Sequence, residues 1–387
     1  MTDSDDQQIE AEQPEPKHFG TGWISGVLST VLGAGGLLAV LCFHFPELMT
    51  MPELRALYPV PYIRALLLLI LVSSFLLGGI SIYLRRSRSI GGIGILLTLV
   101  AVMFGGSSVP IDGELRNGPF LGLDWFLLNI LGFSAVFVPI EQLFPLRREQ
   151  PIFREYWKTD LAYFFVSHVF VQFITIVMLK PAMVFFAWAT VPAVREFISG
   201  QNVVVQFFGI MLIADLTQYW VHRAFHSFRF LWRFHAVHHS AQSMDWLAGS
   251  RLHLVDIAVT RALSYLPIYL LGFAEGPLFA YIVFVSFHAT FIHSNFRFEF
   301  GPLQWIFATP RFHHWHHTAD LAYADKNFAV HLPFLDKLFG TYCFPRSKWP
   351  ERYGVDDPEV PPSGFFAQMS YPFGRRVSSE STSESTQ

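Results

Sequence analysis

The stretch ADLTQYWVHRAFHSFRFLWRFHAVHH, residues 214–239, decides how this chain folds. It carries five histidines within eighteen residues, and a second cluster, HHWHH, follows at residues 313–317. The spacings are HxxxH and, twice, HxxHH. On a helix, side chains three or four positions apart lie on one face, so each cluster directs imidazoles toward a common point.

These clusters predict a metal site, because imidazole nitrogen binds iron, zinc, copper or nickel. Histidines that are merely hydrogen-bonded or exposed are the alternative, and three motifs with ligand spacing on a helix disfavour it. No HExxH motif is present, so a mononuclear zinc protease is not indicated. Eight histidines exceed the capacity of one ion and suggest two: His222, His226, His235, His238, His239, His313, His316 and His317.

The composition indicates a polytopic membrane protein. The 387 residues are 52% hydrophobic and 15% charged, with a mean hydropathy of +0.37, whereas a soluble domain carries roughly 25% charged residues. The net charge of −3 gives no reason to expect a nucleic-acid partner. Two cysteines cannot hold a four-thiolate iron–sulfur cluster. Since no nucleotide-binding glycine motif is present either, any electrons must come from a separate protein.

We therefore expect an all-α polytopic membrane bundle with a histidine-rich metal-binding cap on the cytoplasmic side. The expected regions are a polar tail (1–19), N-terminal spans (20–119), a histidine-bearing region (120–345) and a C-terminal tail (346–387). A short apolar piece at 181–194 is re-entrant or interfacial, and 257–271 with 277–291 form a hairpin. Runs near the roughly 20 residues that cross a bilayer lie at 23–43, 62–84, 90–111, 120–144, 161–178 and 203–220.

Basic residues predict the orientation of these spans. They cluster after the second run, at residues 85–88, and after the fourth, at residues 147–158. Both clusters fall on one side if the N-terminus is cytoplasmic, and the sixth run then ends on that side. We expect both termini and the histidine boxes to be cytoplasmic.

Asp215 lies on the same helical stripe as Tyr219, His222 and His226. Because a carboxylate at membrane depth is costly, Asp215 is expected to face the protein interior. It either accepts a hydrogen bond from a ligand imidazole, which would fix the tautomer, or is satisfied by a helix neighbour.

The motifs DLTQYWVHRAFH, LWRFHAVHHS, RLH, FIHSN, TPRFHHWHH and DKLFGTY occur in this order over about residues 120–345. In this respect the chain resembles the sterol desaturase and fatty acid hydroxylase superfamily of membrane di-iron oxidoreductases. The resemblance implies that 120–345 is the catalytic region and that the eight box histidines are ligands. It also implies a ligand role for His293, in HSN.

Four other histidines are weaker candidates. His314 is the odd member of its cluster and is expected beside the ligands or exposed. His288 precedes His293 by five residues, nearly one helical face away. His253 lies in RLHLVD, where the family has R-x-H-P and this chain has a leucine, so its role as a ligand is in doubt. His331 is expected to be structural.

The resemblance implies two iron ions, with zinc as an alternative occupant after purification, and O₂ as co-substrate. No catalytic residue is expected beyond the ligands. The partners implied are a lipid substrate and an electron donor of the ferredoxin or cytochrome b type with its reductase. The reaction is hydroxylation or desaturation of a sterol, fatty acyl, ether-lipid or carotenoid C–H bond in lipid metabolism. A non-catalytic metal- or lipid-binding membrane protein and a metal transporter are the rival interpretations.

Arginines around the boxes have two interpretations. They face lipid headgroups, or they present a basic surface to an acidic electron carrier. The residues concerned are Arg223, Arg229, Arg233 and Arg311.

Overall fold

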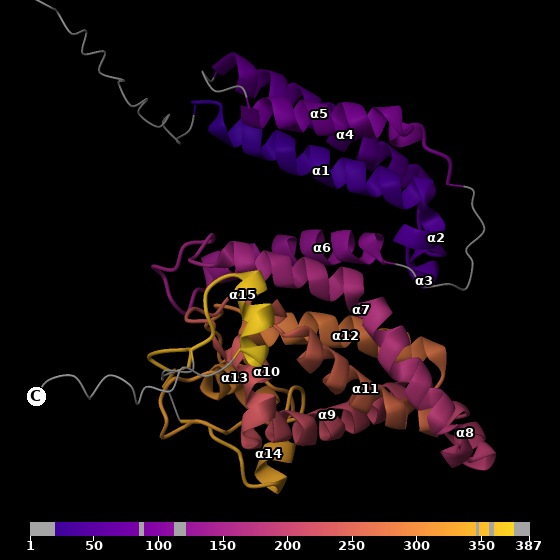
Figure 1. Ribbon diagram of the computed structural model, residues 1–387, viewed down its shortest axis with the longest axis vertical. Helices are drawn as coiled ribbons and strands as arrows, with labels where there is room; N and C mark the ends of the chain where they lie inside the picture. The colour runs from indigo at the N-terminus through magenta and orange to yellow at the C-terminus, as the bar shows by residue number, and fades with distance from the viewer. Residues whose placement is uncertain (1–19, 85–88, 112–120, 346–347, 356–359, 375–387) are drawn as a thin grey trace, which may run out of the picture. The chain divides into compact units, whose positions relative to one another are not determined.

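The computed structural model describes residues 20–84, 89–111, 121–345, 348–355 and 360–374 (Figure 1). Within these ranges the regular structure is helical and no strand forms beyond two isolated β-bridges, which confirms the predicted all-α class. The tail predicted at 1–19 and the residues from 375 onward lie outside the described ranges. The chain divides into two units, Met1–Leu127 and Leu128–Gln387, called unit 1 and unit 2.

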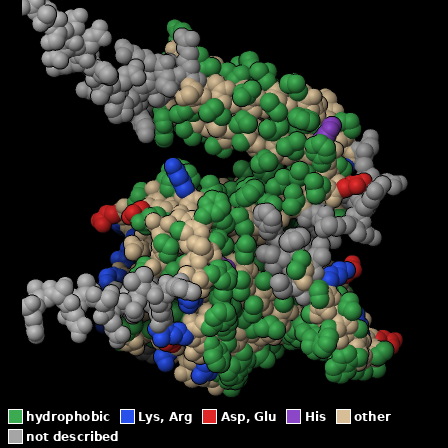
Figure 2. Space-filling model, in the orientation of Figure 1, with side chains coloured by type: hydrophobic (Ala, Val, Ile, Leu, Met, Phe, Trp, Pro, Cys, Tyr) green, Lys and Arg blue, Asp and Glu red, His purple; other side chains and the backbone are tan. Residues whose placement is uncertain are grey.

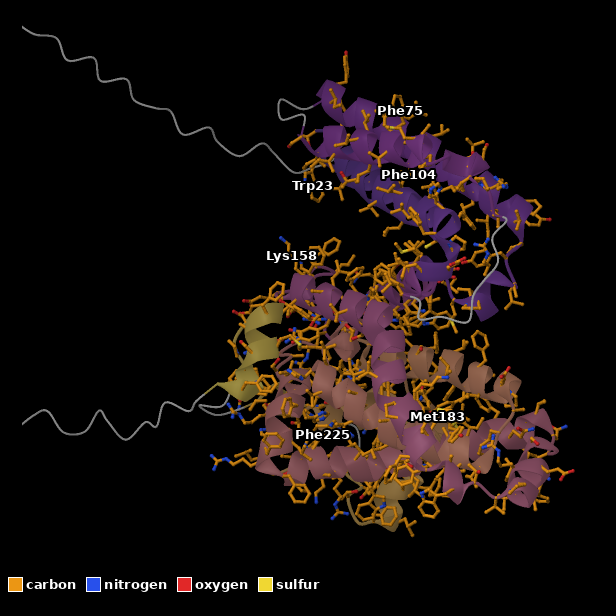
Figure 3. All side chains as sticks on the ribbon, turned by 45° about the vertical axis from the view of Figure 1, so that its right-hand side comes forward. Trp23, Phe75, Phe104, Lys158, Met183 and Phe225 are labelled. Carbon is orange, nitrogen blue, oxygen red and sulfur yellow. The ribbon has the colours of Figure 1, made fainter. Side chains whose placement is uncertain are left out.

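Unit 1 is built on three long helices, α1 (Trp23–His44), α4 (Val60–Leu84) and α5 (Ser89–Met103), with the short α2 (Pro46–Met49) and α3 (Pro52–Arg55) between the first two. Trp23 and Phe75, labelled in Figure 3, lie on α1 and α4. All three long helices pack against one another.

Small residues let these helices approach closely. A Cβ added to Gly94 would collide with the Ser29 hydroxyl and lie 2.7 Å from the Ser29 carbonyl carbon, and one on Gly33 would lie 2.8 Å from the Gly94 oxygen. Ser29 and Ser74 each donate to the other's carbonyl at 2.7 Å. Such contacts are typical of helix association in membranes, where van der Waals packing and interhelical hydrogen bonds replace the hydrophobic effect.

Unit 2 holds the histidine boxes. Its long helices follow α6 (Leu123–Leu143), which begins just before the unit boundary. Turns at Phe228, between α9 and α10, and at Gly272, between α11 and α12, redirect the chain; Gly272 has φ 74°, which glycine adopts without steric cost. The remaining helices are α7 (Trp157–Phe185), α8 (Pro192–Ser199), α9 (Val203–Ser227), α10 (Arg229–His239), α11 (Leu254–Leu271), α12 (Glu275–His293), α13 (Pro310–His316), α14 (Phe334–Leu338) and α15 (Phe365–Ser370).

Seven helices in the described part of the chain are long and apolar enough to cross a membrane: α1, α4, the stretch Ser89–Ser108, α6, α9, α11 and α12. They include five of the six predicted runs and both arms of the predicted hairpin. The run predicted at 161–178 lies in α7, which is helical but is not among the seven. The chain is a multi-pass membrane protein.

The predicted cap forms at one end of unit 2. In Figure 1, α10, α13 and α15 gather at one end of this unit and α8 lies at the other. Thr309 starts α13 by accepting a hydrogen bond from the Phe312 amide, and Pro310 occupies the first turn. Phe225, labelled in Figure 3, lies inside the unit and is 1% exposed. The ends of α9 and α12 therefore meet the short helices of the cap.

Candidate metal centre

Two groups of imidazoles converge in the described part of unit 2. In each group, the ligand atoms lie within 4.8 Å of one another, and every member of the second group is buried. Group A consists of His222, His226, His235, His239 and His316, and group B of His238, His293, His313 and His317. The nine histidines that the sequence and the family resemblance singled out are thus brought together, and the groups adjoin, with the stacked rings of His239 and His317 4.4 Å apart between centroids.

Helical spacing explains how each HxxHH box is divided. Side chains at i and i+4 lie on one face, and the i+3 side chain lies to its side. On α10, His235 and His239 therefore enter group A and His238 enters group B. In the box at α13 the residues at i and i+4, His313 and His317, again stay together but enter group B, and His316 at i+3 enters group A. Each short helix thus contributes to both groups.

In group A, oxygen acceptors fix the orientation of four imidazoles through Nδ1. Two acceptors are carboxylates: Asp256 accepts from His235 at 2.6 Å and Asp325 from His226 at 2.9 Å. The other two are carbonyls, Phe328 for the ring at 222 and Lys326 for the ring at 316, both at 2.8 Å. With the proton on Nδ1, the Nε2 lone pair is free to bind a metal.

In group B, two imidazoles are fixed by carbonyls alone. His238 Nδ1 donates to the Arg251 oxygen at 3.0 Å, and His293 Nδ1 to the Ala289 oxygen at 2.6 Å. The Nε2 atoms again face one another, at 2.9 Å between His293 and His313.

The donor set fits metal ions. The Nε2 atoms of His226, His239 and His316 are buried without a hydrogen-bond partner, although buried polar atoms are normally satisfied. The Nε2 atoms of His222 and His235 lie 2.9 Å apart, and each already has its proton on the opposite nitrogen. A cation bound between these nitrogens would give the unpartnered Nε2 atoms a partner and would remove the repulsion between the facing lone pairs of His222 and His235.

Burial keeps the cap imidazoles neutral, which is the protonation state that binds metal. The pKa values of His238, His239 and His317 lie well below the usual range, first because burial disfavours the charged form and second because neighbouring imidazoles repel a further charge. Burial likewise lowers the pKa of His313 and of His316 well below the usual range.

A buried ion network supports group B. Arg154 pairs with Asp160 at 2.6 Å and with Asp245 at 2.7 Å, and Arg251 also pairs with Asp160. All four side chains are at most 7% exposed, and the Arg251 carbonyl accepts from His238. The sequence placed Arg154 among loop charges that set orientation; in the structure it is buried and neutralised.

The weaker candidates lie outside both groups. The Asp215 carboxylate accepts from the amides of residues 330–332, so its partners are backbone groups rather than a ligand imidazole. His253 accepts from the Val255 amide at the start of α11. His288 contacts the Ala308 oxygen. His314 is fully buried, which excludes the exposed one of its two predicted alternatives; its Nδ1 lies 2.8 Å from the Tyr353 hydroxyl.

His331 has partners of its own, away from the two groups. Its ring lies between Tyr281 and His288. His331 Nδ1 is 3.1 Å from His288 Nδ1, and the Tyr281 hydroxyl lies beside His331 Nε2.

The site residues that sequence reasoning missed are the hydrogen-bond acceptors of the group A imidazoles. Asp325 and the carbonyls of Lys326 and Phe328 carry no motif, and the acid at 256 was noted only for its place in RLHLVD. A usable signal was present for Asp256, which falls three residues after His253 and begins an apolar helical run.

The arginines around the boxes differ in exposure. Arg311 is 6% exposed and bonds Glu299, which contradicts a headgroup or docking role for it. Arg233 donates to the carbonyls of Tyr371 and Gly374, while Arg229 is exposed. Figure 2 shows that Lys and Arg side chains gather at the cap end of unit 2.

The chain is similar to several known proteins. Residues 207–341 match the fatty acid hydroxylase family. Ornithine lipid hydroxylase OlsE of Rhizobium tropici is 37% identical over 43% of this chain and 50% of its own length. Human alkylglycerol monooxygenase is 31% identical over 35% of this chain and 30% of its own length.

A third relative matches over a longer stretch. Methylsterol monooxygenase 1 of Gallus gallus is 25% identical over 56% of this chain and 72% of its own length. The chain spans half or less of the length of the ornithine lipid and alkylglycerol enzymes. No solved structure matches it significantly.

Proposed function

We propose that this chain, whose residues 207–341 match the fatty acid hydroxylase family, is a membrane enzyme that uses two iron ions and O₂ to hydroxylate a lipid. One observation carries the proposal: nine imidazoles converge in two adjoining groups, with orphaned Nε2 atoms pointing inward. Group A would hold one ion and group B the other.

The reaction inserts one oxygen atom of O₂ into a C–H bond and reduces the other to water, consuming two electrons and two protons. When bound, the iron pair supplies the redox chemistry that activates O₂. The described residues at the two groups are imidazoles, carbonyls and the carboxylates of Asp256 and Asp325; we assign the imidazoles the task of holding the ions and the oxygen acceptors that of fixing ligand orientation. Burial of the groups restricts water, which protects a reactive oxidant from side reactions.

A lipid substrate is supported by where the ligands lie along the spans. His222 and His226 are in the last two turns of α9 and His293 ends α12, so both apolar helices lead from the bilayer to the metal groups. A lipid that enters between helices reaches the site without crossing water.

Hydroxylation is favoured over desaturation by the relatives, which are named a hydroxylase and monooxygenases. Their names also cover ornithine lipid, alkylglycerol and methylsterol substrates. We propose a polar lipid or a sterol as the substrate of this chain. The assay below identifies the substrate and the carbon atom that is hydroxylated.

We assign the electrons to a separate donor of the ferredoxin or cytochrome b type. The Lys and Arg side chains that Figure 2 shows at the cap end of unit 2 suit an acidic carrier approaching that end.

We place the cap and both termini in the cytoplasm, on the charge distribution around the spans. This orientation requires α7, a helix of 29 residues, to cross the membrane in addition to the seven spans, because an odd number of crossings would put the termini on opposite sides. Arg147 and Lys158 lie in the loop and first turn that follow α6. A reporter fused to the C-terminus should read as cytoplasmic. A periplasmic or lumenal reading would contradict this orientation.

The function is tested with protein purified in detergent and returned to lipid nanodiscs. We expect two iron ions per chain and O₂ consumption that depends on both reductant and an added lipid, with ¹⁸O from labelled O₂ in the lipid product. Candidate lipids carrying ornithine, ether-linked alkyl chains or methylsterol rings are supplied separately. A chain that binds iron but consumes no O₂ with any of them would favour the non-catalytic interpretation.

A further inference from the structure

The segment of residues 325–328 supplies an acceptor to three of the five group A imidazoles. Asp325 Oδ1 accepts from His226 Nδ1, the Lys326 carbonyl from the ring at 316 and the Phe328 carbonyl from the ring at 222, all at 2.8–2.9 Å. These rings come from two different helices, α9 and α13. Four consecutive residues therefore fix ligands that lie about 90 residues apart in sequence.

The backbone of the segment has an unusual shape that makes this arrangement possible. Asp325 and Asn327 have φ of 54° and 59°, in the left-handed region. Aspartate and asparagine tolerate that region better than other residues with a Cβ. The two left-handed residues bracket Lys326, so that both its carbonyl and that of Phe328 turn toward group A.

Buried polar side chains stabilise this backbone conformation through hydrogen bonds. The Asn327 amide donates to the carbonyls of Phe312 and Cys343 and accepts from the Cys343 amide, all at 2.7–2.9 Å. The Asp336 carboxylate accepts from the amides at 328 and 329. Asp215 accepts from the next three amides, and all three polar side chains are fully buried. Asp215, which the sequence placed on the ligand stripe of α9, therefore fixes the backbone that directly follows this segment.

Group B shares none of these contacts among the described residues. The acceptors of its imidazoles are the carbonyls of Arg251 and Ala289, which lie elsewhere in the chain. Among the described residues, the imidazoles that hydrogen-bond to residues 325–328 thus all belong to group A, and the Asn327 amide also bonds the Phe312 carbonyl of α13.

We propose that residues 325–328 are the positioning segment of the group A ion, and that disturbing them empties group A while group B keeps its ion. This inference rests on the proposed function, because it assumes that each group holds iron. The acceptors fix the rotation of three rings, and hydrogen bonds to ligand imidazoles of this kind change metal affinity by roughly 10–100-fold.

The primary test replaces Asp325, whose side chain is 70% exposed, so that its loss should not unfold the protein. Asp325→Ala removes the acceptor for His226, and Asp325→Asn keeps an oxygen acceptor. Asp320→Ala is the matched control, an exposed acid nearby that caps the Ala322 amide. Iron per chain is measured at limiting free iron, with Mössbauer spectra to separate the two ion environments.

We expect Asp325→Ala to weaken one iron site by about 10-fold or more, while Asp325→Asn and Asp320→Ala match the wild type. Asn327→Ala, which loses three hydrogen bonds, should lower the occupancy of that ion further than Asp325→Ala does. Retention of both ions at wild-type affinity in Asp325→Ala, or equal loss of both, would overturn the assignment.

Double variants show which ion is lost. Adding Asp325→Ala to His222→Ala should remove no further iron, because group A is already disabled. Adding it to His313→Ala should remove the remaining ion. The reverse pattern would refute the link to group A. A wild-type chain that binds no iron would instead refute the proposed function, so the two failures are distinct.

Discussion

Unit 1 and unit 2 hold their helices together by different means. In unit 1, glycines and small hydroxyl residues bring α1, α4 and α5 into direct backbone contact, and shape decides the fit. In unit 2, imidazoles and charged side chains occupy the interior, and directional bonds decide the fit. A buried polar group costs free energy unless its partner is in place, so single changes in unit 2 should have larger consequences.

The largest effect is expected for His238→Ala. It removes a ligand of group B, so lipid oxidation should fall below detection together with one iron ion. His331→Ala should keep appreciable activity, and His314→Ala should be intermediate at most, because neither belongs to the two groups. Turnover and iron content are measured at matched amounts of folded protein. Full turnover by His238→Ala would contradict the assignment of the ligands.

Asp160→Asn tests the ion network that supports group B. Arg251 would lose its carboxylate partner while remaining buried, and breaking such a pair costs about 3–5 kcal/mol. The change should appear as a lower unfolding midpoint in detergent, whereas Glu155→Gln, at a nearby exposed acid, should leave the midpoint unchanged. Equal midpoints for both variants would show that the network contributes little.

Gly94→Ala tests the close packing of unit 1. The new methyl group meets the Ser29 backbone, which cannot rotate away, so a destabilisation of about 1–3 kcal/mol is expected. Gly92→Ala is the control, because no atom lies within 4 Å of its added Cβ. Iron content should be unchanged in both variants, and loss of iron in Gly94→Ala would show that the two units depend on each other.

The smallest effect is expected for Thr98→Val, which keeps the side-chain volume and removes a hydroxyl. That hydroxyl donates to Ser74 Oγ at 2.7 Å, and interhelical hydrogen bonds in membrane proteins contribute about 0.6 kcal/mol on average. Unfolding in detergent should detect a shift of this size. A loss as large as that of Gly94→Ala would mean that hydroxyl bonds, rather than shape, hold unit 1 together.

The sequence predicted the spans and the histidines because both signals are local. Apolar runs reveal helices, and HxxHH spacing reveals a shared face. The carbonyl acceptors of the imidazoles were out of reach, because any residue type carries a backbone carbonyl such as that of Phe328. Its direction depends on the left-handed backbone at Asn327 and on Asp336, which no periodicity reports. The burial of Arg154 was also out of reach, since its charge was counted but its pairing with Asp245, 91 residues later, leaves no local signal.

The division of each HxxHH box between the two groups has a consequence for how the protein is made. His226 on α9 shares group A with His316, about 90 residues later in the chain. At roughly 5–20 residues per second, the ribosome needs roughly 5–20 s to reach α13 after completing α9. During that interval the imidazoles of α9 and α10 lack the histidines of residues 313–317, which complete both groups. Neither imidazole group is complete until translation has passed α13, so under the proposed function iron loading would report on a chain that has been synthesised through the histidine box at α13.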